Sequence, residues 1–496
     1  MKKNVIINTG NRLLVRNPPI DLSKRFVNSL TEFSTYTKFP LPVFTAIVPT
    51  RIDGEIYTSL PMNIWPKLLE EEFPNHELIH QNLPELDEYP KIDVSLHDWA
   101  EPRDWIQDDA EEFLLDTENT SAKVLALDTG KGKSFMMLNL ICQLKTKFLV
   151  VVHNPSLYLN PWMKDANKFS DNINEDNVKM LAGFESIERE LKNGCSSDGY
   201  FISAKTITSL CISSGKNELF QNFMNACNFG LVIYEEAHLS YNAIFHCNAQ
   251  CTPYLSVFLT ATPERTSPSA QKVLKKILPY SEEWFGLQKK YRNPNYIHWV
   301  KFNFVSNPSE SDINAVEGGK GVSIPVYSNY ICNNDLAYER FYANIYRIVK
   351  MSIERDLKLL IYLGSLPLIK KVCDDISEDF GSEYVGNYTS LVKKKEKEAE
   401  LEKLIIVTTI RSLDAGKDLS VDNVAICIPL SSSPALKQVY GRMRYDSINH
   451  FKKPDGSVRP YFLFDIMDIG FPKVKANIKY RAKVLKPVAR KISEKE

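Results

Sequence analysis

The sequence predicts an α/β protein with two parallel-sheet domains, preceded by a small α+β unit. Three observations lead to this fold class. The chain has 496 residues, which is too long for a single ordinary core. Continuous apolar runs such as KFLVVVHN alternate with longer helical patterns, which is typical of strands buried on both faces of a parallel sheet. A stretch rich in Ser, Asn, Gly and Pro interrupts this alternation, which then resumes.

The order of the patterns along the chain predicts five segments. Residues 1–97 contain short alternating runs and a helical pattern, so we expect a small α+β unit that ends in an acidic, proline-containing linker. Residues 98–305 carry the first strand–helix alternation and residues 326–470 the second, as right-handed βαβ units require. Residues 306–325 are interpreted as the linker between these two domains. Residues 471–496 form a strongly basic tail with a partly helical pattern.

Composition and charge narrow the possible partners. Hydrophobic residues make up 44% of the chain and charged residues 25%, as in a soluble globular protein. Lys and Arg total 61, and so do Asp and Glu, so any nucleic-acid site must be a local basic surface. No apolar run is long enough to span a bilayer, and the N-terminal stretch lacks a signal-peptide core. We therefore expect a cytoplasmic protein with no membrane partner.

The nine cysteines are scattered along the chain, which favours a reducing compartment. The stretch HCNAQC places His246, Cys247 and Cys251 at ligand-like spacing. One such cluster without a second pair is weak support for a zinc site. We therefore favour an interpretation of these cysteines as buried thiols.

A glycine-rich turn lies between a strand pattern and a helix pattern at LDTGKGKS, residues 127–134. Such a turn points backbone N–H groups at phosphate oxygens, and the helix N-terminus adds partial positive charge. Lys133 can reach the β- and γ-phosphates, and the hydroxyl of Ser134 can ligate Mg²⁺. The alternative is an ordinary strand-to-helix turn without a ligand. We predict that the whole turn binds nucleotide, through Thr129, Gly130, Lys131, Gly132, Lys133 and Ser134.

Two adjacent carboxylates follow another buried strand pattern in LVIYEEAH. A nucleotide hydrolase needs one carboxylate for the Mg²⁺ shell and a second to orient the attacking water. We predict these roles for Glu235 and Glu236, respectively. Two acids in a solvated loop are the alternative, which is less plausible so soon after a phosphate-binding turn.

The stretches LDTGKGKS, YEEAH, FLTATPER and QVYGRMR occur in the order of motifs I, II, III and VI of superfamily 2 helicases. The chain resembles this family over about residues 100–470, and it looks most similar to phage UvsW-type branch-migration helicases and related viral helicases. Motif II of the family usually begins with Asp, where this chain has Glu235. The resemblance implies two RecA-like domains that form a helicase motor, with ATP and Mg²⁺ bound in the cleft between them.

The resemblance also implies roles for residues outside these two motifs. PRDWIQ is similar to the motif whose glutamine reads the adenine edge, and IVTTIRSLDAGKDLS is similar to motif V. In motif VI the second arginine of the family lies where this chain has Tyr445, so the catalytic arginine is either Arg442 or Arg444. The further residues implied for the nucleotide site are Gln107, Gly416, Asp418 and Gln438.

Nucleic-acid contacts are implied by the segments that resemble motifs Ia, Ib and V. The residues concerned are Pro155, Lys205, Thr206, Thr409 and Arg411. Such contacts are made mainly to the sequence-independent backbone. The basic tail could add phosphate contacts or could be a solvated helix; its basic residues are Lys473, Lys475, Lys479, Arg481 and Lys483.

The function implied by the resemblance is an ATP-dependent DNA helicase or translocase that remodels branched or duplex DNA in replication or recombination. By analogy, the N-terminal unit grips duplex DNA, with Arg12 and Arg16 facing the DNA, and other replication proteins are possible partners. If the protein is viral, the cytoplasm is that of the host cell. Two alternatives stay open: an origin-binding or transcript-releasing ATPase, and a non-catalytic nucleic-acid scaffold.

Overall fold

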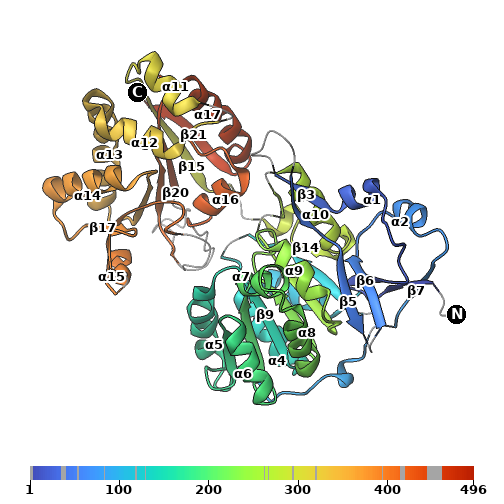
Figure 1. The fold of residues 1–496 in the computed structure, drawn as a ribbon. Coiled ribbons are helices and arrows are strands. Elements are labelled where there is room, and N and C mark those ends of the chain that lie inside the picture. Colours follow the sequence, from blue (N-terminus) through green and yellow to red (C-terminus); the bar gives the residue numbers. More distant parts are fainter. Residues whose placement is uncertain are drawn as a thin grey trace. The chain divides into compact units, whose positions relative to one another are not determined.

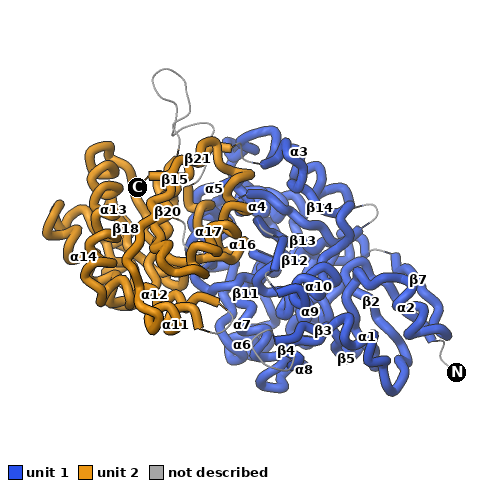
Figure 2. The backbone as a smooth tube through the Cα atoms, turned by 90° about the horizontal axis from the view of Figure 1, so that it is seen from above, with its two compact units in different colours: residues 1–292 blue, residues 293–496 orange. Residues whose placement is uncertain are grey.

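A computed structural model describes the chain between residues 4 and 495. Within these limits it leaves out residues 35–40, 53–54, 83, 118–119, 129, 262, 266, 293–294, 319–320, 394, 414–418 and 444–460, and the side chain of residue 434. The chain forms two compact units, residues 1–292 and residues 293–496, which we call unit 1 and unit 2 (Figure 2). No helix in the described part of the chain is long and apolar enough to cross a membrane.

The N-terminal part of unit 1 is a small α+β unit, as predicted. Its sheet has the order β5-β6-β2-β1-β7, in which only the β1–β7 pair is parallel. A separate two-stranded sheet, β3-β4, and two short helices accompany it. The elements are β1 (Val5–Asn8), β2 (Arg12–Arg16), α1 (Lys24–Ser29), β3 (Thr31–Phe33), β4 (Pro42–Thr45), β5 (Val48–Ile52), β6 (Glu55–Pro61), α2 (Pro66–Glu72) and β7 (Glu77–His80).

The rest of unit 1 contains a seven-stranded parallel sheet with the order β10-β11-β9-β12-β13-β8-β14 (Figure 1). The strands are β8 (Ala122–Leu125), β9 (Phe148–Val152), β10 (Val178–Leu181), β11 (Gly199–Ser203), β12 (Leu231–Tyr234), β13 (Leu255–Leu259) and β14 (Trp284–Phe285). Every residue of β8, β9, β11, β12 and β13 is buried, which explains why these strands appear in the sequence as continuous apolar runs.

Helices cover both faces of this sheet. One face packs against α3 (Trp105–Leu115), α4 (Lys133–Leu144) and α5 (Lys164–Phe169). The other packs against α6 (Phe184–Lys192), α7 (Ala204–Thr208), α8 (Asn217–Cys227), α9 (Tyr241–Asn248) and α10 (Pro268–Ile277). The apolar core on this second face continues into the N-terminal unit, where it includes Phe26, Phe44 and Leu60. The N-terminal unit is therefore packed onto the parallel-sheet domain through a shared core.

Unit 2 has a second seven-stranded parallel sheet, with the order β17-β18-β16-β19-β20-β15-β21 (Figure 1). The strands are β15 (Ile297–Phe304), β16 (Leu359–Tyr362), β17 (Val385–Tyr388), β18 (Ile405–Thr408), β19 (Asn423–Ile426), β20 (Tyr461–Asp468) and β21 (Ala489–Lys495). The helices are α11 (Glu310–Glu317), α12 (Ile324–Asn333), α13 (Asp335–Glu354), α14 (Leu366–Phe380), α15 (Lys397–Glu402), α16 (Ser433–Tyr440) and α17 (Pro472–Leu485). Two parallel-sheet domains were predicted, and this prediction is confirmed.

The segment boundaries differ from those expected from the sequence. β15, which we had placed in the first domain, pairs with β20 and β21 in the second sheet. The expected linker 306–325 contains α11, and the expected basic tail folds as α17 and the edge strand β21. The acidic stretch after β7, which was expected to be a linker, packs against the rest of unit 1. Tyr89 and Val94 are buried, and the N–H of Ile92 donates to the carbonyl of Lys145 (3.0 Å).

Arg12 does not face solvent, so the prediction that it contacts DNA is wrong. Its side chain is 3% exposed and donates from Nη1 to the carbonyl of Asn248 (2.5 Å) and from Nη2 to Oγ1 of Thr252 (3.3 Å). Burial lowers the pKa of Arg12 to about 10. Arg16 is half-buried and pairs with Glu55 (3.2 Å). Arg12 thus fastens the N-terminal sheet to the end of α9.

The HCNAQC stretch lies at this same junction. Cys247 and Cys251 are free thiols, the first buried and the second half-buried. The His246 ring lies 6.0 Å from that of Phe44, and its Nδ1 is buried without a hydrogen-bond partner among the described residues. Burial lowers the pKa of His246 to about 4. Among the residues that the structure describes, no group of three or more His, Cys, Asp or Glu side chains could hold a metal ion.

We expect the buried His246 to make folding stability depend on pH. Its pKa is about 6.5 when unfolded and about 4 when folded, so the unfolded chain binds the proton more tightly. The folding stability that depends on a neutral His246 is fully present above pH 6.5 and is lost as the pH falls towards 4. The loss should reach about 2 kcal/mol in the free energy of unfolding near pH 5. Urea denaturation at several pH values should show this loss of stability in the native protein but not in His246→Phe. Identical pH dependences of the two proteins would contradict the prediction.

Candidate nucleotide site

The predicted phosphate-binding turn connects β8 to α4. Gly130 and Gly132 adopt φ values of +83° and +78°, a conformation that side chains other than glycine rarely take. A Cβ atom on Gly132 would also lie 2.2 Å from Nε2 of Gln107, so a side chain there would displace the Gln107 amide. Lys133 is the first residue of α4, and its Nζ donates to the carbonyls of Leu127 (2.9 Å) and Asp128 (3.2 Å). Thr129 lies outside the described residues.

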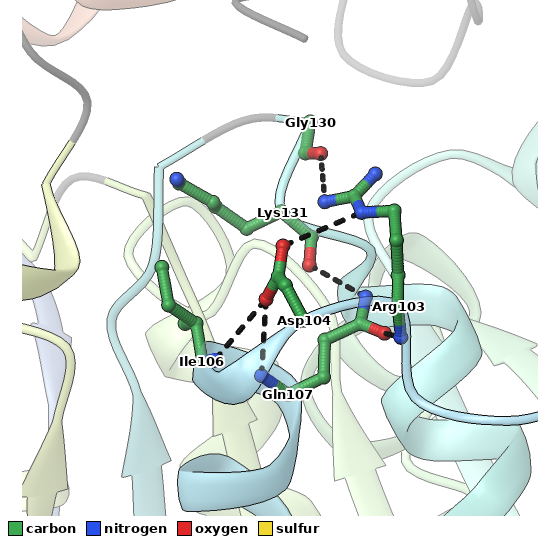
Figure 3. A network of polar contacts seen from close by, with 6 residues as sticks. All are labelled: Arg103, Asp104, Ile106, Gln107, Gly130 and Lys131. Atoms are coloured by element: carbon green, nitrogen blue, oxygen red, sulfur yellow. Dashed lines mark hydrogen bonds and ion pairs between the residues drawn. The ribbon is translucent and has the colours of Figure 1, made fainter. Parts of the chain in front are cut away.

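The start of α3 supports the outer side of this turn (Figure 3). Gln107 donates from Nε2 to the carbonyl of Lys131 (3.1 Å) and accepts at Oε1 from the N–H of Arg103 (2.7 Å). Arg103 also donates from Nη2 to the carbonyl of Gly130 (3.3 Å). Asp104 caps α3 by accepting from the N–H of Gln107 (3.4 Å), which fixes this glutamine in place. Gln107 is only 3% exposed.

Glu235 follows β12 directly, and its backbone N–H still donates to the carbonyl of Val151 (2.9 Å). Its Oε2 accepts from the indole N–H of Trp162 (2.9 Å), a buried residue in the turn η3 (Tyr158–Met163). Burial raises the pKa of Glu235 to about 7, although the Trp162 bond and the charge of Lys133 act in the opposite direction. Trp162 was not among the predicted site residues, and its only signal in the sequence is its place two residues before α5.

Glu236 adopts a φ of +46°, which is rare for a residue with a side chain and typical of strained functional positions. Its Oε2 lies 3.4 Å from Nδ1 of His238, which lies 2.9 Å from Oγ1 of Thr260. Both His238 and Thr260 are buried, and Thr260 donates its N–H to the carbonyl of Leu125 (3.1 Å). A chain of contacts therefore joins Glu236 to the end of β8, where the phosphate-binding turn begins.

The phosphate-binding turn, Glu235 and Glu236 lie at one edge of the parallel sheet, because parallel strands present their carboxyl ends together. The segments proposed for nucleic-acid contact start at the same edge, where Val152 of β9 pairs with Ser203 of β11. Pro155 begins the short helical turn η2 (Pro155–Leu157) and is exposed. On α7, Lys205 is exposed and Thr206 is half-buried. The two predicted contact segments thus lie side by side.

In unit 2, Arg442 lies two residues beyond the last residue of α16. It donates from Nη2 to the carbonyl of Leu413 (3.1 Å) and shares a small cavity with Gln438 and Tyr362. Burial raises the pKa of Tyr362, and the neighbouring Arg442 opposes this shift.

The other predicted residues of unit 2 are only partly described. Thr409 accepts at Oγ1 from the N–H of Ser412 (3.0 Å), and Arg411 is exposed. Gly416, Asp418 and Arg444 lie outside the described residues.

The carboxyl edge of the parallel sheet in unit 1 carries the oxygen donors predicted for Mg²⁺. Magnesium prefers oxygen ligands, and the hydroxyl of Ser134 and the carboxylate of Glu235 are the oxygen donors predicted for it. Ser134 lies in the first turn of α4 and is half-buried. The side chains present therefore fit the predicted cofactors.

Comparisons with known proteins support this assignment of fold. Residues 96–265 match the family model described as the type III restriction enzyme, res subunit. A DEAD-box helicase, Mss116 bound to ssRNA and UDP-BeF, matches with a TM-score of 0.52 at 13% identity, over 79% of this chain and 75% of that one. The chain has the fold of a helicase motor. No curated protein sequence matches the chain.

Two further solved structures are similar. Mss116p, with its NTE and C-tail deleted and bound to ssRNA and AMP-PNP, gives a TM-score of 0.50 at 13% identity, over 76% of this chain and 72% of that one. The Pyrococcus furiosus Hef helicase domain gives a TM-score of 0.45 at 14% identity, over 76% of this chain and 98% of that one. The two Mss116 structures show that the two sheets of this chain are RecA-like, as the resemblance implied.

Proposed function

We propose that the protein is a superfamily 2 helicase or translocase that couples ATP hydrolysis to the remodelling of branched or duplex DNA in replication or recombination. The observation that carries the proposal is the chain of contacts in unit 1 that joins Glu236, through His238 and Thr260, to the β8 end of the phosphate-binding turn. A carboxylate placed to orient water beside a phosphate-binding turn is the arrangement that nucleotide hydrolysis requires.

Each group has a distinct task in this reaction. The N–H groups of the turn and Lys133 bind the β- and γ-phosphates, and Glu236 orients the attacking water. Ser134 and Glu235 would hold Mg²⁺, which would neutralise phosphate charge when bound. The indole N–H of Trp162 holds the carboxylate of Glu235 in one position, which compensates for the greater flexibility of Glu compared with Asp. Arginine from unit 2, Arg442 or Arg444, is proposed to neutralise the charge that develops on the γ-phosphoryl group.

Glu236→Gln is the first test of this function. The substitution keeps the size of the side chain but removes the charge that orients water. We expect ATP hydrolysis to fall by about 10²–10⁴-fold, with nucleotide binding retained. Steady-state hydrolysis and binding of a fluorescent nucleotide measure the two effects. Loss of binding together with hydrolysis would indicate a structural role for Glu236 instead.

The nucleic-acid partner is proposed to be bound through backbone contacts by the loops that follow β9 and β11, and by Thr409 and Arg411. The two Mss116 structures contain ssRNA, so RNA should be compared with fork, junction and duplex DNA in the same assay. Stimulation of hydrolysis by RNA alone would favour a transcript-releasing or other RNA-directed ATPase. A chain that binds nucleic acid without any hydrolysis would be a scaffold.

The basic residues of helix α17 fall into two sets, one with structural contacts and one exposed. Arg481 is fully buried and forms an ion pair with Asp465, and Lys473 donates from Nζ to the carbonyl of Glu317, so these two residues have structural roles. Lys475, Lys479 and Lys483 are exposed and one turn apart, on a helix that contains no acidic residue. We propose that these three lysines contact phosphates.

Replacing all three exposed lysines with glutamine should weaken nucleic-acid binding and reduce its salt dependence. Each lost phosphate contact lowers the slope of log K against log salt by about 0.7–0.9, so a total decrease of about 2–3 is expected. A matched control replaces three exposed lysines elsewhere in unit 2, Lys350, Lys370 and Lys395, with glutamine. Fluorescence anisotropy at several salt concentrations measures both variants. Equal slopes in the native and triple-variant proteins would show that α17 is merely solvated.

A further inference from the structure

Both the nitrogen and the oxygen of the Gln107 side-chain amide form hydrogen bonds within the protein (Figure 3). Its Nε2 faces the carbonyl of Lys131 at 3.1 Å, and its Oε1 faces the N–H of Arg103 at 2.7 Å. With 3% of its surface exposed, the residue presents almost nothing to a ligand. A glutamine that reads a base edge needs both a donor and an acceptor directed at that base. Here one N–H of Nε2 and one lone pair of Oε1 are engaged by the backbone of the protein. The burial of the residue leaves the remaining donor and acceptor almost inaccessible to a base.

These contacts determine the direction of the phosphate-binding N–H groups. In a trans peptide the C=O of one residue and the N–H of the next point in opposite directions. The carbonyls of Gly130 and Lys131 are directed at Arg103 and Gln107. The N–H groups of Lys131 and Gly132 therefore point away from α3, as a cradle for phosphate oxygens requires. The tight contact that a Cβ on Gly132 would make with Nε2 of Gln107 shows how closely the amide supports the turn.

We propose that Gln107 is a positioning residue for the phosphate-binding turn, and that this site selects its substrate by the triphosphate group and not by the base. The proposal rests on the nucleotide site proposed above and names its substrate class as nucleoside 5′-triphosphates of any base. It replaces the expected role of Gln107 in reading adenine. ATP, GTP, CTP and UTP should bind with similar affinity, and inorganic tripolyphosphate should compete with all four.

Binding measurements with native protein and Gln107→Met test the proposal. Methionine has a similar length but offers neither bond. We expect the native protein to bind the four nucleotides within about fivefold of one another. Gln107→Met should bind the nucleotides and tripolyphosphate more weakly by one common factor, on the order of tenfold for two lost hydrogen bonds. Gln81→Met, at an exposed glutamine of unit 1, is the control and should bind as the native protein does.

The outcomes separate the inference from the proposed function. If Gln107→Met loses ATP but keeps GTP and tripolyphosphate, Gln107 reads the base and the inference is overturned. A native protein that binds ATP far more tightly than GTP overturns it as well, even if the variant does not fold. If the native protein binds none of the five ligands, the proposed function fails, together with the inference. An unchanged melting temperature in Gln107→Met, with the common loss of affinity, supports local positioning of the turn.

Discussion

Lys133→Ala should reduce nucleotide hydrolysis on the order of a thousandfold or more, because we propose that its ammonium group binds the β- and γ-phosphates. Lys133 opens α4, and its Nζ reaches back over the turn to the carbonyls of Leu127 and Asp128. These contacts hold the ammonium group at the phosphate-binding turn. The fold should survive, since the half-buried side chain supports no apolar core.

The neighbouring Lys131 provides the matched control for this experiment. Lys131→Ala removes the same charge from the same turn, but Lys131 precedes the helix and contributes its carbonyl to Gln107 through the backbone, which the substitution keeps. We expect it to change hydrolysis far less than Lys133→Ala does. Nucleic-acid-stimulated hydrolysis and thermal unfolding should be measured for both variants. Near-normal hydrolysis by Lys133→Ala would show that the turn does not bind the reacting phosphates.

The sequence contained enough information for the central strands of both sheets because these strands are buried on both faces. Such strands have no polar alternation, and they stand out as apolar runs that end in the residues of the site. The carboxyl edge of a parallel sheet then brings Lys133, Glu235 and Glu236 to one side without any further information. The fold class and the location of the unit 1 site could be predicted for this reason.

The contacts that refine the site could not be predicted, since they join residues far apart in sequence. A buried Trp162 requires a partner for its indole N–H, but nothing in the sequence indicates that this partner is Glu235. Arg12 is the first residue of the strand sequence RLLVR, and an arginine at a strand end is typical of an exposed position. Its burial depends on a carbonyl acceptor at Asn248. In contrast, α11 had a local signal that we overlooked, the capping box between Ser309 and Asp312.

The last prediction concerns the catalytic arginine. A continuous helix through QVYGRMR would direct Arg442 and Arg444 to opposite sides, but α16 ends at Tyr440 and Gly441 is its C-cap. Arg442 thus lies beyond the helix, where its guanidinium bonds the carbonyl of Leu413 in the middle of the segment that resembles motif V. A guanidinium has five N–H donors, so this bond can orient Arg442 while other donors serve a phosphate.

Arg442→Ala should therefore lower the rate of ATP hydrolysis by about 10³–10⁵-fold with little loss of ATP affinity, because the arginine charge matters most as the transition state forms. Arg442→Lys keeps the charge but loses the planar fork of donors that bonds two acceptors in a fixed geometry, so it should restore little activity. Single-turnover rates and nucleotide affinities of both variants and of Arg444→Ala decide between the two arginines. Normal hydrolysis by Arg442→Ala with an inactive Arg444→Ala would exchange their roles, and the bond to Leu413 would then be purely structural.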